Sequence, residues 1–78
     1  MPYIKQEDRA RAAKLPETPG ELNYAITQLC IDYANQEPPS YAMYNLIIGV
    51  LECAKLEFYR RVVVPYENGK HEQNGDVY

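Results

Sequence analysis

The sequence contains few of the residues that hold metals or build disulfide frameworks. It has 2 cysteines, 1 histidine and no tryptophan in 78 residues. Cys30 and Cys53 each lie in an apolar helical pattern, where a free thiol packs as a small hydrophobic side chain. His71 lies in a polar segment and no Cys-x-x-Cys occurs. We therefore expect no metal site and no cofactor, with a Cys30–Cys53 bond as the lesser alternative to two free thiols.

Basic residues and long apolar runs are also scarce. The chain has 8 Lys and Arg against 11 Asp and Glu, a net charge of −3, and this balance disfavours a generic nucleic-acid surface. No run approaches the roughly 20 apolar residues of a membrane span. The first residues, MPYIKQEDRARAAK, are charged and unlike a signal peptide. These features predict a cytoplasmic protein without a membrane partner.

No set of residues typical of a catalytic site can be assembled. Glu52 and Glu57 are five residues apart, which places them about 140° apart around a helix, whereas helical carboxylate ligands usually follow a Glu-x-x-Glu or Glu-x-x-His spacing. A Ser-His-Asp set would need the single His71, and no glycine-rich phosphate loop is present. The sequence therefore predicts a protein that is not an enzyme.

Capping and proline signals predict an all-α protein with three helices in one domain, residues 1–78. Thr18-Pro-Gly-Glu21 has the pattern of a capping box with proline in the first turn. Two prolines and a serine then break the chain before a long apolar segment. The helices are predicted over about 5–14, 19–36 and 41–64, as a short N-terminal helix followed by an antiparallel helical hairpin.

Residues 66–78 are predicted to form an irregular tail. Pro65 is expected to end the third helix, because proline lacks the N–H that a helix interior requires. The tail also contains two Asn-Gly steps, at 68–69 and 74–75, and this dipeptide is a strong turn signal.

The third predicted helix is apolar on two sides, and the second side needs the first helix or another subunit to cover it. One stripe contains Tyr44, Ile47, Leu51, Ala54, Phe58 and Val62, and the other contains Met43, Leu46, Val50 and Cys53. A single facing helix covers only about 100° of arc. Gly49 disfavours a helix interior by about 1 kcal/mol relative to Ala, which a close helix crossing would offset. We predict a symmetric homo-oligomer.

Four residues near the end of this helix form a candidate ligand site: Tyr59, Arg60, Arg61 and Tyr66. Arginine supplies forked donors for a phosphate, and tyrosine supplies a ring on which a planar group can stack. The alternative is an ordinary helix end, with the tyrosines at the rim and the arginines near the last carbonyl groups.

A polar row adds two further candidates, Asn45 and Glu52. With Tyr59 they are spaced seven residues apart and therefore share one helical face, where they could line a pocket. The alternative is a solvent-facing edge on which Glu52 and Lys55 form a surface ion pair.

Four segments carry a resemblance to a known family: MPYI, GELNYAITQLC, IGVLECAKLEFYRRVVVPYE and NGDVY. Together they resemble a family of short proteins of uncharacterised function found in phages, prophages and microbial genomes. The resemblance implies a small accessory protein of viral origin, acting in the host cytoplasm, and carries no catalytic residues with it.

Small phage proteins of this kind commonly act by binding. We therefore expect an oligomer that sequesters an anionic, nucleotide-like signalling ligand at a subunit interface, as an anti-defence protein would. The alternative is an adaptor or inhibitor that meets a host protein through the same tyrosine-rich apolar surface.

Overall fold

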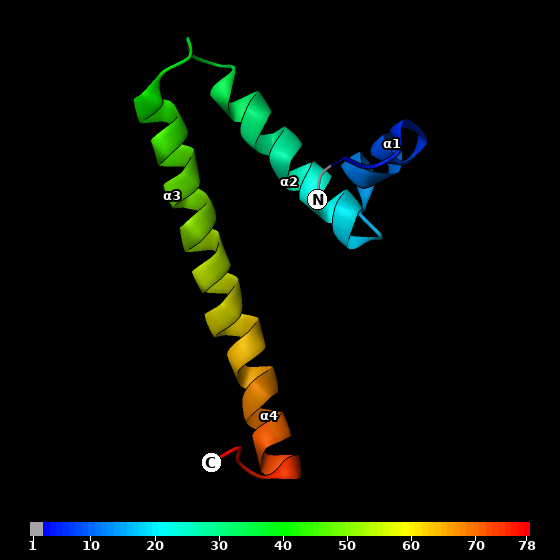
Figure 1. The fold of residues 1–78 in the computed structure, drawn as a ribbon, viewed down its shortest axis with the longest axis vertical. Helices are drawn as coiled ribbons and strands as arrows, with labels where there is room; N and C mark the ends of the chain where they lie inside the picture. Colours follow the sequence, from blue (N-terminus) through cyan, green and yellow to red (C-terminus); the bar gives the residue numbers. More distant parts are fainter. Residues whose placement is uncertain (1–2) are drawn as a thin grey trace. The chain divides into compact units, whose positions relative to one another are not determined.

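The computed structural model describes residues 3–78, the side chain of Ala12 excepted, and every regular element in that range is helical (Figure 1). The all-α fold class is thereby confirmed. The elements are α1, Gln6–Lys14; α2, Pro19–Ala34; α3, Tyr41–Phe58; the π-helical segment η1, Tyr59–Val63; and α4, Val64–Asn74.

Contacts within the chain gather in two compact units, Met1–Tyr44 and Asn45–Tyr78. They are called the N-terminal unit and the C-terminal unit below. The organisation of the chain as one domain, and the antiparallel hairpin of α2 and α3, stay predictions.

The first turn of α2 forms as its capping signal indicates. Thr18 has an extended backbone, and its Oγ1 accepts a hydrogen bond from the N–H of Glu21 at 3.1 Å. Pro19 occupies the first turn, where a missing N–H does no harm. The helix ends at Ala34, two residues before the predicted end, and the N–H of Asn35 bonds to the carbonyl of Ile31.

Polar contacts join α1 to the start of α2. Arg11 donates from Nε to Glu21 Oε1 at 3.1 Å and from Nη2 to Glu21 Oε2, and the N–H of Glu17 donates to the same Oε1 at 3.1 Å. The Glu21 side chain is only 2% exposed. The guanidinium of Arg9 lies over the Tyr24 ring, 5.3 Å from its centroid. The N-terminal unit is therefore held by an ion pair between the half-exposed Arg11 and the buried Glu21 carboxylate, and by a cation–π contact.

Apolar burial contributes little to either unit. Among the side chains that the structure describes, Glu21 is the one that is fully buried. Large apolar side chains of α2 lie at the surface, with Leu22, Ile26, Leu29 and Tyr33 all exposed. Among these described side chains, the most buried one is thus charged rather than apolar.

The prediction that Pro65 ends the helix, and that the chain is irregular from residue 66, is wrong as far as Asn74. In η1 the N–H of Val64 bonds to the carbonyl of Tyr59, five residues back, so the backbone is wider just before the proline. Pro65 then falls in the first turn of α4, where no N–H is needed. The third predicted helix therefore continues through η1 into α4 (Figure 1).

Only one of the two Asn-Gly steps changes the course of the chain. Gly69 lies inside α4. Gly75 has φ 86°, and its N–H bonds to the carbonyl of His71 at 2.9 Å, which ends the helix. Residues 75–78 are irregular, as predicted.

Within residues 3–78 we find no helix that is both long enough and apolar enough to cross a membrane.

Candidate functional site

Four of the six candidate residues lie where α3, η1 and α4 meet. Tyr59, Arg60 and Arg61 are the first three residues of η1, and Tyr66 is in the first turn of α4. We call these four residues the Tyr–Arg junction. All four side chains are exposed. π-helical turns are rare and recur at functional sites, so the local backbone adds a reason to consider this segment.

Tyr59 is tied to α4 by its hydroxyl group. The hydroxyl donates a hydrogen bond to Glu67 Oε1 at 3.2 Å, eight residues ahead. The hydrogen bond to this carboxylate, followed by the negative charge of Glu67, raises the pKa of Tyr59 above its ordinary value. The phenol therefore stays protonated at neutral pH and serves as a donor.

The two arginines share one carboxylate. Arg60 donates from Nη2 to Glu57 Oε2, and Arg61 Nη1 lies 3.7 Å from Glu57 Oε1. Both arginine side chains are 73% exposed. Glu57 offsets one of the two positive charges, so the pair presents a net charge of about +1 to a ligand.

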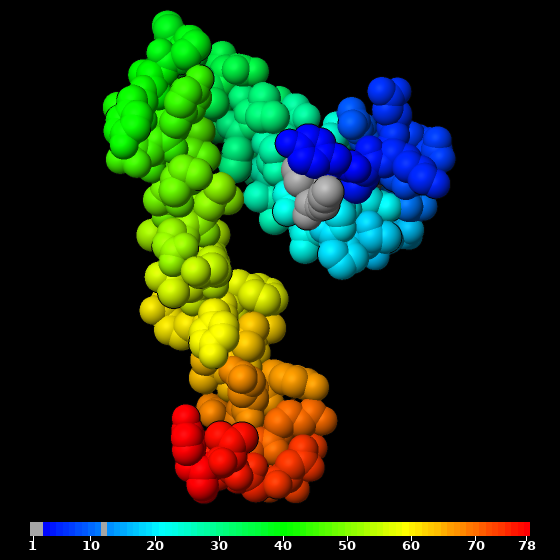
Figure 2. Space-filling model, viewed as in Figure 1, coloured from blue at the N-terminus to red at the C-terminus, as the bar shows by residue number. Residues whose placement is uncertain are grey.

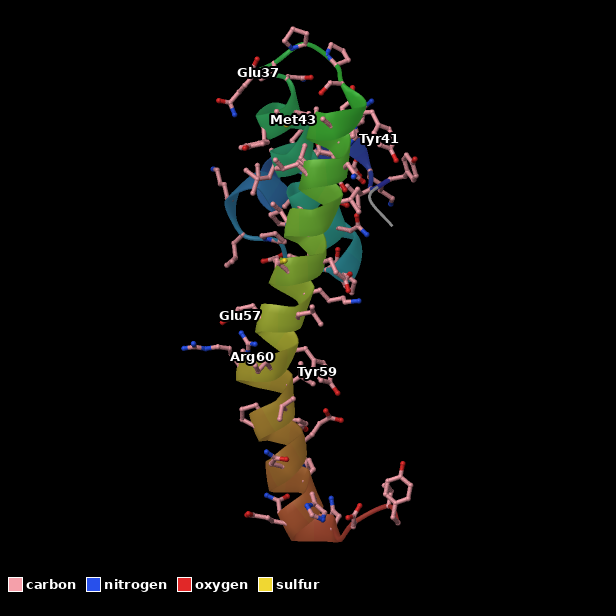
Figure 3. All side chains as sticks on the ribbon, turned by 90° about the vertical axis from the view of Figure 1, so that its left-hand side faces the viewer. Glu37, Tyr41, Met43, Glu57, Tyr59 and Arg60 are labelled. Carbon is pink, nitrogen blue, oxygen red and sulfur yellow. The ribbon has the colours of Figure 1, made fainter. Side chains whose placement is uncertain are left out.

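Tyr59 and the arginine pair do not face the same way. Figure 3 shows Glu57 and Arg60 projecting from one side of the helix and Tyr59 from the other. Lys70 Nζ lies 5.6 Å from the centroid of the Tyr66 ring, so a cation of the chain itself covers one face of this ring. The junction therefore contains the expected tyrosine and arginine side chains, but these side chains do not point toward one common site.

Asn45 and Glu52 lie away from the junction, on α3. Fourteen residues separate Asn45 from Tyr59, which is about 21 Å along a helix. Glu52 Oε1 lies 3.0 Å from Lys55 Nζ, the surface ion pair that the alternative interpretation anticipated. Both Asn45 and Glu52 are exposed, and a ligand-binding role for them stays a prediction.

The second notable surface of the C-terminal unit is apolar. Within this unit, seven large apolar or aromatic side chains of α3 and η1 are at least half exposed: Leu46, Ile48, Val50, Leu56, Phe58, Tyr59 and Val62. Figure 2 shows one face of this unit, coloured from yellow-green to red. A helix that is apolar over so wide an arc is normally covered by other protein.

The sequence analysis did not identify the contacts that two acidic residues, Glu57 and Glu67, make with the Tyr–Arg junction. Glu57 precedes Arg60 and Arg61 by three and four residues, a spacing at which helical side chains pair, so it could have been found. Glu67 follows Tyr59 by eight residues, and the contact depends on the helix continuing past Pro65. In the part of the chain that the structure describes, no group of three or more His, Cys, Asp or Glu side chains is placed to hold a metal ion.

The fold and its surfaces define a small all-helical protein with little apolar burial and an exposed junction of tyrosine and arginine. The chain belongs to the family described as Domain of unknown function (DUF6899), whose model matches residues 1–77. A comparison with curated proteins and one with solved structures gave no match. This match confirms the resemblance to a family of uncharacterised function. The link to phages stays a prediction.

Proposed function

We propose that this protein is a non-catalytic binding protein that works as a homo-oligomer and recognises another protein through the apolar and tyrosine-rich surface of its C-terminal unit. The observation that carries the proposal is the exposure of large apolar side chains along α3 and η1, with Phe58 60% exposed. Contiguous exposed apolar surface on a helical protein is typical of a protein–protein interface.

The hairpin of α2 and α3, the oligomer and the cytoplasmic location belong to the same proposal. The short link between Ala34 and Tyr41 favours antiparallel neighbours. A phage origin, taken from the resemblance, would make the recognised protein a component of the host.

Affinity capture from a host lysate tests this function, with Phe58→Glu as the test variant and Glu72→Lys as the control. Phe58 belongs to the apolar surface, whereas Glu72 is an exposed polar residue of α4. We expect a stoichiometric protein to bind the wild type and the control and to be lost with Phe58→Glu. Equal capture by all three proteins, each with unchanged circular dichroism, would rule out this surface.

Capture of an anionic, nucleotide-like ligand is the second candidate function. It is supported by the Arg60–Arg61 pair, whose positive charge Glu57 offsets only in part, and by the nearby tyrosine rings. In its sharpest form the ligand is a nucleotide messenger of host defence, held at a subunit interface.

Calorimetric titration separates this candidate from protein recognition. The probes are cyclic dinucleotides, cyclic trinucleotides and cyclic ADP-ribose isomers, at tens of micromolar protein. The Arg60→Ala/Arg61→Ala double variant should abolish the heat, whereas Lys55→Ala, which removes a positive charge from another surface pair, should leave it unchanged. If no probe gives heat with the wild type, the ligand-capture hypothesis fails.

A further inference from the structure

The two Asn-Gly steps of the chain contain the same residues but differ in backbone structure. Asn68 and Asn74 are both exposed, and each is followed by a glycine. Asn68-Gly69 lies at the middle of α4, whereas Asn74 is the last residue of that helix. Gly75 has φ 86° and ψ 161°, a conformation outside any regular helix. Exposure therefore does not distinguish the two asparagines, but their positions relative to the helix do.

An asparagine that precedes a glycine can deamidate without an enzyme. The backbone nitrogen of the glycine loses its proton and attacks the side-chain Cγ of the asparagine, and the side-chain nitrogen leaves as ammonia. The product is a five-membered succinimide ring, which water opens at either of its two carbonyl groups to give aspartate or isoaspartate. In sum, asparagine and water become an acidic residue and ammonia. Glycine favours the attack because it has no Cβ to crowd the nitrogen.

An intact helix prevents this attack at Asn68. Each N–H inside a helix is directed at the carbonyl four residues back, and the helical backbone of an asparagine holds the next nitrogen away from its own Cγ. Freeing Gly69 from the C-terminal end of α4 requires residues 70–74 to leave the helix first. The reaction at Asn68 therefore needs most of the second half of α4 to unfold.

The end of α4 is held by less. The N–H of Gly75 bonds to the carbonyl of His71 at 2.9 Å, and this bond closes the last turn. Helix ends fray, because no further turn lies beyond them. The contact of His71 Nε2 with Asp76 Oδ2 at 3.4 Å joins two exposed side chains and adds little. Asp76 Oδ1 accepts a hydrogen bond from the N–H of Val77, so this bond lies within the irregular residues and does not hold the last turn closed.

We propose that Asn74 is a site of spontaneous deamidation in the folded protein and that α4 protects Asn68. Water is the only co-reactant. The glycine whose positive φ ends the helix is also the residue that makes the preceding asparagine reactive, and both properties come from its missing Cβ. The site lies wholly within the C-terminal unit and is independent of the proposed function.

Deamidation changes the end of α4 in two ways. An acidic residue at position 74 adds a negative charge to the last turn, where the helix dipole favours a positive one. Isoaspartate also adds a carbon atom to the main chain, which moves the N–H of Gly75 away from the carbonyl of His71. The last turn of α4 should therefore open as the protein ages.

Peptide mass spectrometry of the full chain tests the proposal, with the two asparagines as an internal matched pair. Trypsin cleaves after Arg61 and Lys70 and so places Asn68 and Asn74 in separate peptides. The chain is kept at mildly alkaline pH in buffer and in guanidinium chloride, until both asparagines have converted in the denaturant. In buffer we expect Asn74 to convert about tenfold faster than Asn68, because the end of a helix opens more readily than its middle. Equal rates in buffer, or an Asn74 that does not convert there, would overturn the proposal.

Two glutamine variants assign the acidic form of the aged protein, which isoelectric focusing separates. Asn74→Gln should remove this form, because glutamine cyclises much more slowly than asparagine, whereas Asn68→Gln should retain it. Hydrogen exchange of the Gly75 N–H should be faster in the isoaspartate form than in fresh protein. An acidic form that persists in Asn74→Gln and is lost in Asn68→Gln would place the reactive step inside α4 and refute the inference.

Discussion

The Glu21 carboxylate is almost fully buried and yet ionised, because three donors surround it. The hydrogen bond from the Arg11 side chain is the largest cause that holds the pKa of Glu21 below the ordinary range of a glutamate, and the N–H of Glu17 acts in the same direction. The same contact raises the pKa of Arg11 further above its already high value. Both groups therefore carry full charge at neutral pH.

Removing the arginine should leave a buried charge without its partner. We expect Arg11→Ala to lower the melting temperature by several degrees, because an unpaired buried carboxylate loses its solvation without compensation. Arg60→Ala is the control, since it breaks an exposed pair with Glu57 and should change the melting temperature little. Thermal unfolding by circular dichroism at pH 7 measures both. Equal shifts would contradict a structural role for the Arg11–Glu21 pair.

The lowered pKa of Glu21 also predicts how stability depends on pH. A carboxyl group whose pKa is lower in the folded state stabilises the fold above its unfolded pKa of about 4.3, and this stabilisation is lost as the pH falls through the folded pKa. Glu21→Gln lacks this titration, so its melting temperature should lie below the wild type at pH 7 and approach it in acid. A difference that stays constant from pH 7 to pH 2 would contradict the assignment.

Sequence alone could predict part of this arrangement. The hydrogen bond that caps α2 joins Thr18 and Glu21, which are three residues apart. This short spacing allowed the sequence to predict the cap. The partner Arg11 lies ten residues before Glu21, on another helix, and the contact depends on how the intervening turn folds. Patterns of local spacing carry no information about such a pair.

At the scale of elements, the continuation of the helix past Pro65 is the main departure from the predicted structure. Proline, glycine and the two Asn-Gly steps each favour a break in a helix, and each is a valid local signal when taken alone. The π-helical turn of η1 changes the hydrogen-bond register just before the proline and removes the conflict. The periodic sequence patterns of helices and strands do not indicate a π-helical turn. The sequence therefore predicts one helix over 41–64, where the structure has three successive elements, α3, η1 and α4.

Two glycines with the same preceding residue test this part of the structure. Gly69→Ala should stabilise the protein by about 1 kcal/mol, because Gly69 lies inside α4 and alanine favours a helix interior. Gly75→Ala should destabilise it by about 1 kcal/mol, because an alanine at φ 86° is strained.

Chemical denaturation and ellipticity at 222 nm measure the two alanine variants. Shifts of opposite sign are expected, with helicity raised only by Gly69→Ala. If both variants lose stability, residues around Gly69 form a turn and α4 does not extend past Pro65.

At the scale of the whole molecule, the sequence is rich in apolar residues, but few of their side chains are buried in the structure. Hydrophobic residues make up 46% of the chain, yet most large apolar side chains are exposed. The sequence predicted this imbalance through the two apolar stripes of residues 41–64, which one facing helix cannot cover. It could not identify the covering surface, because the same stripes fit a second copy, a foreign protein or the other unit of the chain.

The stability of such a chain should depend on its concentration. Folding that is completed by association is favoured by mass action, and for a dimer each tenfold rise in protein concentration contributes about 1.4 kcal/mol of stability. The melting temperature of the wild type should therefore rise by a few degrees per tenfold increase in concentration. The Gly49→Leu variant, which should be monomeric, is the control, and its melting temperature should be lower and independent of concentration.

Differential scanning calorimetry over a hundredfold range of concentration makes this measurement. A wild-type melting temperature that does not change over that range would mean that each chain completes its fold alone. The exposed apolar side chains of α3 and η1 would then have to be covered within one chain, by the N-terminal unit, and the protein would reach its partner as a monomer. A concentration-dependent melting temperature that Gly49→Leu abolishes would instead place the missing apolar burial at a contact between subunits that includes Gly49 of α3.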